Sequence, residues 1–318
     1  MLDNIPKISV LVISYNQERY ISRAIESLLS QKDYIYEICV SDDSSKDKTW
    51  EILQDYDRRY PGLFKLNRNE HNVGIFENIE KTWEMPTGEI ISRLSGDDEC
   101  GNDWYRHIIE FIKNEEIDYH KELFCIYGDY QCIYPNGDCY VYKNKNVNYN
   151  SDYLSLAIRQ IISSNRATCY SKQVLDKFKK VSRGRSHIAE FIQDRQLQIY
   201  TKNNYYIHQI GNVYYTGLGV SSKRDLLYYE DREQIIPYAL NCLDKFGVEI
   251  CKADYNLLLF YAERSKNYRD KSLSHKWLLI KYLALSLDAR YYFKAISIRR
   301  YLFAFFRRIP HNKPLLWV

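Results

Sequence analysis

The chain has 318 residues, of which 45% are hydrophobic, and its 45 Lys and Arg against 41 Asp and Glu give a formal net charge of +4. This charge is too small to indicate nucleic-acid binding by itself, and no apolar run approaches the roughly 18 residues that would span a bilayer. The N-terminus lacks a basic-then-apolar signal peptide and the eight cysteines form no C-x-x-C pair, so we expect reduced thiols and a cytoplasmic protein. A chain of this length buries the core of one large domain with an appendage, or of two modest domains.

The first hundred residues alternate between strand-like and helix-like segments. The nearly continuous β-branched run at residues 7–14 predicts a strand buried on both faces, as in a parallel sheet. Further strands are expected at 36–41, 64–66 and 89–94, with helices at 18–30, 50–60 and 75–83. These alternations predict right-handed β-α-β units and therefore a parallel sheet.

After Trp104 the rhythm changes. A helix is expected at 104–113, followed by a hairpin whose strands, 123–134 and 139–142, are joined by the turn Pro135-Asn136-Gly137-Asp138. A mixed stretch to about residue 183 precedes a helix around 188–200. From 225 to 308 the pattern is almost wholly helical.

Two adjacent carboxylates follow the fourth predicted strand, in the segment Ser95-Gly96-Asp97-Asp98. Hard divalent ions such as Mg²⁺ and Mn²⁺ prefer carboxylate oxygens and often bridge the protein to phosphate oxygens of a substrate. The alternative for such a pair, taken alone, is a solvated turn. The loops after the other strands decide between these interpretations.

Polar side chains also follow the first and second predicted strands. They are Ser14, Tyr15 and Asn16, then Asp42 and Asp43. Because the carboxyl ends of parallel strands meet at one edge of a sheet, we expect them to lie near Asp97 and Asp98. An aromatic ring, hydrogen-bond acceptors and a metal pair are what a nucleoside diphosphate requires.

Each of these residues also has a purely structural interpretation. Tyr15 could be a core ring that covers the end of the sheet. Asp42 and Asp43 could cap the following helix, as Ser44 and Ser45 also could. Arg68, in the polar loop 67–74, could equally be a phosphate contact or a surface charge.

Several motifs in a fixed order resemble the family 2 glycosyltransferases. The motifs are Ile8–Asn16, Ser27–Gln31, Glu37–Thr49, Asn72–Gly74, Thr87–Ile91 and Ser95–Asp98. The resemblance is strong over 7–105, thinner to about 222 and absent beyond. It implies an inverting enzyme of the GT-A fold, an α/β architecture with a nucleotide-sugar-binding, Rossmann-like mixed sheet flanked by helices. The predicted domains are 1–222, with a nucleotide-binding half at 1–105 and an acceptor half at 106–222, and a C-terminal helical region at 223–318, which is predicted from its helical pattern alone.

The resemblance also implies roles for the residues that match the family's motifs. Ser14 and Tyr15, with Asn16 beside them, resemble the residues that hold the nucleobase, and Asp42 or Asp43 would bind the uracil edge or the ribose. Asp97 resembles the metal-binding carboxylate of the family's D-x-D motif, and Asp98 would support it or contact the donor sugar. Ser95 stands where the family usually has an acid. It can hydrogen-bond ribose but adds no charge, so weaker metal binding is expected.

The family needs a general base on its acceptor half. Residues 192–197 resemble the family's x-D-x-x-L element, which makes Asp194 the predicted base. Glu190, four residues earlier on the same predicted helical face, is the rival, and a surface charge beside Arg195 is the structural alternative for Asp194. Further on, residues 213–217 match a strand and a Tyr-rich loop that closes over the phosphates in the family.

The C-terminal segment is strongly basic. Residues 271–308 carry nine Lys and Arg against one acid, Asp288, a net charge of +8, whereas the rest of the chain sums to −4. Basic residues beside an aromatic stripe suit anionic lipid headgroups, each contributing roughly 1 kcal/mol near such a surface. The alternative is a packing face against the catalytic domain or against a second copy of the chain in a homodimer. We expect no nucleic-acid partner, because no base-reading module is visible.

Together these features predict an inverting, metal-dependent sugar transferase that acts in polysaccharide biosynthesis. A nucleotide sugar, most simply a UDP-sugar, would donate the sugar with Mn²⁺ or Mg²⁺ as cofactor. A hydroxyl of a surface polysaccharide or lipid-linked oligosaccharide would accept it. One alternative is a catalytically silent sugar-nucleotide-binding or scaffold protein, which Ser95 supports. The other is a nucleotidyltransferase, which would normally show a Gly-rich basic loop after its first strand, unlike residues 14–17 here.

Overall fold

The computed structural model describes residues 5–143, 167–178, 180, 197, 200–201, 203–218 and 259 of the chain. The chain divides into two compact units, Met1–Leu154 with Asn165–Arg224, and Ser155–Ser164 with Asp225–Val318. All described residues except Leu259 belong to the first unit. The predicted C-terminal helical region and the predicted base, Asp194 or Glu190, lie outside the described residues, and the predicted domain boundaries stay predictions.

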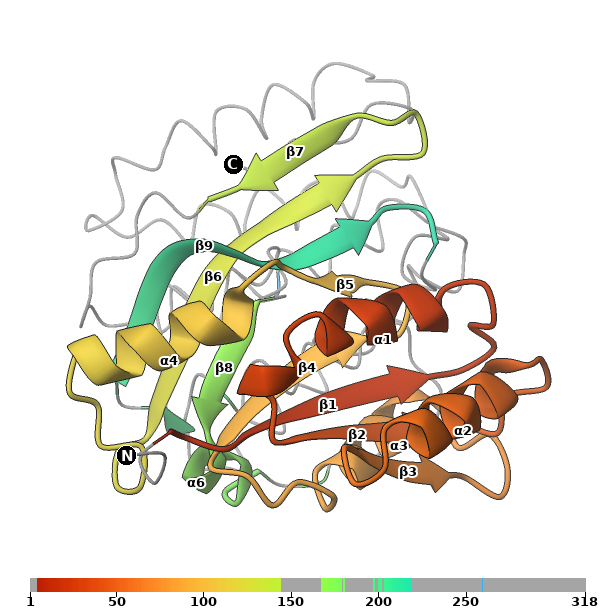
Figure 1. Ribbon diagram of the computed structural model, residues 1–318, viewed down its shortest axis with the longest axis horizontal. Coiled ribbons are helices and arrows are strands. Elements are labelled where there is room, and N and C mark those ends of the chain that lie inside the picture. The colour runs from red at the N-terminus through yellow and green to blue at the C-terminus, as the bar shows by residue number, and fades with distance from the viewer. Residues whose placement is uncertain are drawn as a thin grey trace. The chain divides into compact units, whose positions relative to one another are not determined.

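One mixed sheet organises the described part of the first unit, with the strand order β3-β2-β1-β4-β8-β6-β9-β5 and with β7 paired to β6 (Figure 1). The strands are β1 Ile8–Ser14, β2 Glu37–Asp42, β3 Phe64–Arg68, β4 Ile90–Ser95, β5 Glu99–Cys100, β6 Phe124–Ile133, β7 Cys139–Tyr142, β8 Thr168–Ser171 and β9 Asn203–Tyr215. The helices are α1 Ile21–Leu29, α2 Thr49–Arg59, α3 Ile75–Thr82, α4 Trp104–Asn114 and α6 Lys172–Leu175, with a 3₁₀ turn at Lys32–Tyr34.

The four N-terminal strands are parallel, as the sequence predicts. In the register, Ser14 pairs with Asp42, Asp42 with Arg68 and Ile13 with Ser95. The last residues of β1, β2, β3 and β4 therefore lie side by side at one edge of the sheet. Nearly every residue of β1 and β2 is buried, because both faces of these strands are covered.

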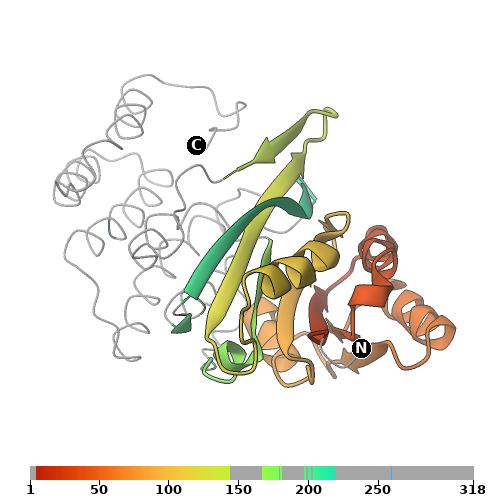
Figure 2. The same ribbon diagram turned by 60° about the vertical axis from the view of Figure 1, so that its left-hand side comes forward.

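Helices cover both faces of this half. The main core joins β1 and β2 to α1, α2 and α4, and the buried stripe of α1 consists of Ile21, Ala24, Ile25, Leu28 and Leu29. Helix α3 lies on the other face, where Asn78 Oδ1 accepts a hydrogen bond from Ser41 Oγ at 2.7 Å. Figure 2 shows the sheet from the side, with α4 against β6 and β9.

The second half of the sheet is mixed, because β8 and β5 run opposite to β1–β4 whereas β6 and β9 run parallel to them. Strand β8 is antiparallel to both β4 and β6, β6 is parallel to β9, and the predicted β6–β7 hairpin is present. Trp104 of α4 fits against two glycines of these strands. A Cβ at Gly128 or Gly211 would lie 2.6 or 2.8 Å from its indole ring. Because these two positions are glycines, α4 can approach β6 and β9 closely.

At the amino edge of the sheet, Glu37 of β2 is a buried carboxylate with many donors. It accepts hydrogen bonds from Ser9 Oγ at 2.6 Å and from the amide and hydroxyl of Thr87, and it pairs with Lys65 Nζ at 2.7 Å. Burial raises the pKa of Glu37, but these donors, Lys65 first, outweigh burial and lower the pKa to about 2. The charged form therefore holds β1, β2 and the turn before β4 together.

Cysteine chemistry agrees with the expected reduced thiols. The six described cysteines are free, and only Cys139 among them is exposed. Burial raises the pKa of Cys39, Cys100 and Cys169 to about 12, so these three thiols are protonated at neutral pH.

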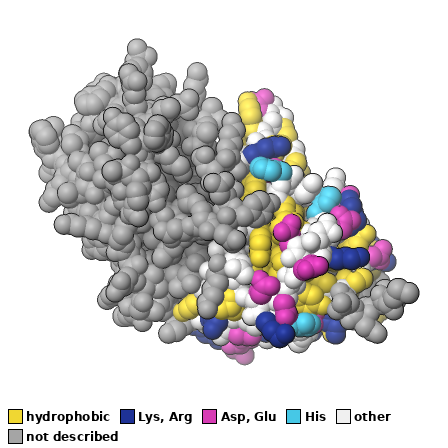
Figure 3. All heavy atoms as spheres, turned by 90° about the vertical axis from the view of Figure 1, so that its left-hand side faces the viewer, with side chains coloured by type: hydrophobic (Ala, Val, Ile, Leu, Met, Phe, Trp, Pro, Cys, Tyr) yellow, Lys and Arg dark blue, Asp and Glu magenta, His cyan; other side chains and the backbone are white. Residues whose placement is uncertain are grey.

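Among the described residues, no helix is long and apolar enough to cross a membrane. On the face drawn in Figure 3, acidic, basic and hydrophobic side chains are interspersed over the described elements.

Candidate functional site

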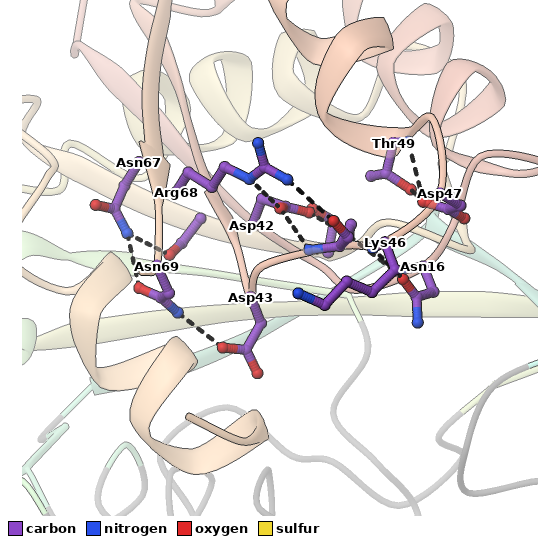
Figure 4. Close-up of polar contacts among 12 residues, drawn as sticks. Asn16, Asp42, Asp43, Lys46, Asp47, Thr49, Asn67, Arg68 and Asn69 are labelled. Atoms are coloured by element: carbon purple, nitrogen blue, oxygen red, sulfur yellow. Dashed lines mark hydrogen bonds and ion pairs between the residues drawn. The ribbon is translucent and has the colours of Figure 1, made fainter. Parts of the chain in front are cut away.

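The carboxyl edge of the four parallel strands brings the predicted N-terminal site residues together. Ser14, Asp42, Arg68 and Ser95 are the last residues of β1, β2, β3 and β4. Hydrogen bonds across this edge connect the loops that follow the strands, and Figure 4 shows those of the first three. The location expected from sequence is therefore observed, and the binding role of each residue stays a prediction.

Asp42 is completely buried and binds the loop that follows it. Its Oδ2 accepts from Ser45 N at 2.9 Å, and its Oδ1 accepts from Ser45 Oγ at 2.5 Å and from Ser14 Oγ at 3.0 Å. These three hydrogen bonds fix the turn that follows β2. Asp42 does not cap α2, which begins at Thr49 and has no side-chain cap, and Ser14 is directed at Asp42.

Asp43 fixes a different loop, and Figure 4 shows its side chain directed toward Asn69 and away from Asp42. Its Oδ1 accepts from Asn69 Nδ2 and Val73 N, and its Oδ2 accepts from Gly74 N, each at 2.9 Å. Gly74 has φ +92°, a backbone conformation that glycine adopts without strain. The backbone of Gly74 thus closely approaches the carboxylate of Asp43.

Tyr15 differs from its neighbours because it reaches solvent. Its side chain is 43% exposed, so it is not a core ring, and it is the aromatic surface available at the end of β1. Asn16 has φ +52° and is held from both sides. Its N–H donates to Ser45 Oγ at 2.9 Å, and its Oδ1 accepts from Lys46 N at 2.8 Å.

Arg68 binds the same turn from the edge of β3. Its Nη2 donates to the carbonyl of Ser45 at 3.0 Å, its Nε lies 3.7 Å from Asp42 Oδ2, and its guanidinium lies 5.4 Å from the ring of Trp50. The part of Arg68 that remains exposed is available to an anionic ligand.

The turn after β4 is as tight as the sequence predicts. A Cβ at Gly96 would lie 2.2 Å from Gln17 Oε1 and 3.0 Å from the carbonyl oxygen of Ile13, so a larger residue would displace the Gln17 side chain and press against the end of β1. Asp97 is half-buried and Asp98 is buried, with its Oδ1 3.4 Å from Tyr215 N. The two carboxylates therefore differ in access to a ligand, and Asp97 is the more accessible.

One side chain that the sequence reasoning missed fixes this turn. Arg23 of α1 donates from Nη2 to the Asp97 carbonyl at 2.7 Å, pairs through Nε with Glu99 Oε1 at 3.0 Å, and lies 3.5 Å from the ring centroid of Tyr215. Tyr215 donates its hydroxyl to Glu99 at 2.5 Å, and burial and this bond raise the pKa of Tyr215 to about 12. We call Arg23, Glu99 and Tyr215 the Arg23 clamp. An arginine on the exposed side of a helical pattern gave no sequence signal for this role.

A cavity of about 450 Å³ lies beside the site, between the end of β3 and α3. Its lining includes Arg68 and His71 of the loop 67–74, and Lys81 of α3. The cavity is on the far side of β3 from the Asp97 turn in the strand order. This position suits a ligand that extends along the carboxyl edge of the sheet past β2 toward β3. It does not suit a metal bound at Asp97.

The donor set at the Asp97 turn suits a hard cation. Within the described residues, no three His, Cys, Asp or Glu side chains converge on one point. Asp97 and Asp98 offer only oxygen, and Mg²⁺ in nucleotide enzymes is commonly bound by one or two carboxylates together with substrate phosphates. The residues present therefore fit an ion that shares its coordination with a bound diphosphate.

The fold is of the GT-A class, as the sequence predicts. S. aureus TarS, residues 1–349, whose crystal structure contains UDP-GlcNAc, superposes with a TM-score of 0.61 at 18% identity over 87% of this chain and 79% of that one. The same mixed sheet with helices on both faces accounts for the similarity.

The chain belongs to glycosyl transferase family 2, whose family model matches residues 9–178. EpsE of Bacillus subtilis is 37% identical over 93 residues, 29% of this chain and 34% of EpsE. The Campylobacter jejuni GalNAc(5)-diNAcBac-PP-undecaprenol beta-1,3-glucosyltransferase is 23% identical over 280 residues, 83% of this chain and 85% of that enzyme. The chain spans only about a third of the length of several curated relatives that it matches, for example 36% and 34%.

Proposed function

We propose that the protein transfers a sugar from a nucleotide sugar, a UDP-sugar, to a hydroxyl group of a carbohydrate acceptor. Family membership supports glycosyl transfer. One structural observation carries the donor assignment: the exposed ring of Tyr15, the guanidinium of Arg68 and the carboxylate of Asp97 stand at the carboxyl edge of the parallel strands, after β1, at the end of β3 and after β4. A base, a phosphate and a metal-bridged diphosphate need these three chemistries along one edge.

The donor site would work by charge neutralisation and orientation. Asp97, supported by Asp98, would hold Mn²⁺ or Mg²⁺, which stabilises the negative charge that develops on the departing diphosphate. Asp42 and Asp43 keep the loops after β1, β2 and β3 in place, so Tyr15 and Arg68 are presented in fixed positions. Such preorganisation lowers the cost of reaching the transition state.

The transfer would invert the anomeric carbon. Asp194 would take the proton of the acceptor hydroxyl while that oxygen forms its bond to the anomeric carbon. The bond from this carbon to the diphosphate oxygen breaks on the opposite face, and its electron pair leaves with UDP. Asp194 and its rival Glu190 lie outside the described residues, so their role depends on the sequence motif alone.

We propose that the acceptor is a surface polysaccharide or a lipid-linked oligosaccharide. The Campylobacter relative acts, by its name, on an undecaprenol-linked glycan. The basic segment 271–308 would place the protein at an anionic membrane surface where such acceptors reside. Sedimentation with vesicles of phosphatidylcholine, with and without phosphatidylglycerol, tests this. Equal sedimentation with both would contradict it, and a dimer in light scattering would favour the packing alternative.

UDP release tests the donor assignment. The wild type and Asp97→Ala are compared on a panel of UDP-sugars with and without Mn²⁺, and Asp55→Ala, at an exposed carboxylate of α2, is the matched control. Asp97→Ala should lower the rate by about a hundredfold or more, because a charge that stabilises the transition state is lost. An unaffected Asp97→Ala would refute the assignment. UDP-sugar binding without turnover would favour a silent binding protein.

A further inference from the structure

A buried carboxylate on the acceptor half is not used in the proposed donor site. Asp129 of β6 is 1% exposed and lies where the pairing of β6 with β9 is irregular. Gly128 pairs with Ile207 and Asp129 with Ile210, so His208 and Gln209 bulge from β9. Bulges of this kind redirect side chains and are frequent beside binding sites.

Three groups converge on Asp129. The hydroxyl of Tyr206 donates to Oδ1, His208 Nδ1 lies 3.4 Å from Oδ1, and Lys143 Nζ lies 3.9 Å from Oδ2. The ring of Tyr206 also packs edge-on against the His208 ring, with centroids 5.2 Å apart. The carboxylate and the tyrosine are buried, whereas the side chain of His208 is 63% exposed. One side of the imidazole therefore contacts buried groups, and the other side is exposed.

The strand register places this cluster at the donor edge of the sheet. Strand β8 connects β4 to β6, because Ile91 pairs with Tyr170 and Tyr170 pairs with Cys125. Four residues further along, Ser95 ends β4 and Asp129 lies in β6, which runs in the same direction. Both residues therefore lie on the carboxyl side of the level at which β8 joins the two strands. An acceptor sugar bound beside the Asp97 turn would approach the cluster from this side of the sheet.

The geometry also sets the chemistry that His208 offers. Of the two neutral tautomers, a carboxylate at this distance from Nδ1 favours the one with its proton on Nδ1, and in that tautomer the lone pair of Nε2 is an acceptor. Within the described residues, Nε2 has no hydrogen-bond partner. A hydroxyl group is the complementary donor, and the nearby ammonium of Lys143 can donate to a second oxygen of the same ligand.

We propose that His208, positioned by Asp129 and Tyr206, binds a hydroxyl group of the acceptor sugar. This inference rests on the proposed function, because it assigns the acceptor side of the same transfer. His208 contacts the substrate in this assignment, and Asp129 acts through it as a positioning residue.

Nitrogen NMR of the histidine side chains tests the positioning without any ligand. The His208 signals are assigned by their absence from the spectrum of His208→Ala. In the wild type they should be those of the tautomer protonated on Nδ1, and Asp129→Asn should lower the population of that tautomer. His208 protonated on Nε2 in the wild type would overturn the proposal.

Acceptor kinetics test the binding role. With UDP-sugars as donors and a panel of p-nitrophenyl glycosides as acceptors, His208→Ala should lower kcat/KM for the acceptor about tenfold, the loss of one hydrogen bond. The Kd of UDP, measured by calorimetry, should not change. His208→Gln, which retains an acceptor atom, should recover part of the loss.

A matched control exists in the same sheet. His120 Nδ1 lies 3.6 Å from Glu89 Oε1 and is similarly exposed, but Glu89 precedes β4 at the opposite edge. His120→Ala should leave acceptor kcat/KM unchanged. An equal effect of both alanine variants, or an equal loss of UDP affinity in His208→Ala, would overturn the proposal. A wild type that releases no UDP from any donor would instead refute the proposed function.

Discussion

Replacement of Asp43 by alanine tests whether the donor edge depends on buried carboxylates. The side chain is 3% exposed and accepts hydrogen bonds from Asn69, Val73 and Gly74, each at 2.9 Å. Hydrogen bonds to a charged group contribute about 1.5–3 kcal/mol each, and buried donors left without a partner are costly. Relaxation of the loop and entry of water make the three losses less than additive. We therefore expect Asp43→Ala to lower the free energy of unfolding by about 4 kcal/mol.

The assay is urea unfolding followed by tryptophan fluorescence and circular dichroism. Asp43→Asn keeps one acceptor oxygen and should lose about half as much stability, roughly 2 kcal/mol. Asp55→Ala is the control, because its ion pairs with Arg58 and Arg59 are exposed and should contribute less than about 1 kcal/mol. A loss below about 1 kcal/mol in Asp43→Ala would show that the network is not a stabilising element of this edge.

Three further predictions concern other parts of the first unit. The pKa of Glu37 is lowered to about 2 from 4.5, so its charged form stabilises the fold by about 3 kcal/mol above pH 4.5, and this contribution is lost as the pH falls toward 2. Unfolding of Glu37→Gln should therefore show a smaller acid-dependent loss than wild type, and parallel pH curves would contradict this. Arg23→Met should fold normally yet weaken Mn²⁺ affinity in the presence of UDP, measured by electron paramagnetic resonance, about tenfold, whereas the exposed Arg19→Met should not. Gly101→Ala should destabilise the fold by more than about 3 kcal/mol, because its Cβ would lie 1.7 Å from the Ile210 carbonyl oxygen, and a wild-type melting temperature would refute this contact.

The parallel half of the sheet was predictable because its signals are local. A nearly continuous β-branched run marks β1, a shorter apolar segment marks β2, and the polar residues that end these strands, Ser14 and Asp42, follow directly in the sequence. Their mutual hydrogen bond was not predictable, because it depends on the register between two strands that are 28 residues apart.

The antiparallel half was predicted less completely. The β6–β7 hairpin has a turn signal, but β8 has only four residues, Thr168–Ser171, and owes its existence to β4 and β6 on either side. The burial of Asp129 likewise follows from a bulge against β9, whose pairing residues come about 80 positions later. Sequence pattern within one strand carries no information on such a partner.

For the candidate site, residue types were easier to predict than their partners. Tyr15 was expected at a strand end and is exposed there, whereas Asp42 and Asp43 are occupied by loop contacts. Arg23 escaped notice because its partners, Asp97 and Tyr215, are distant in the sequence and meet it only after the sheet forms.

The Arg23 clamp also has a mechanical consequence. One guanidinium joins a helix of the donor half, the turn that carries Asp97, and the last residue of β9. The end of β9 and this turn are therefore joined through a single side chain. A displacement of Tyr215 would reach the backbone of the Asp97 turn through Arg23 and would not be absorbed by an independent loop. In the proposed function, the acceptor half is in this way connected to the turn that carries the metal-binding carboxylates.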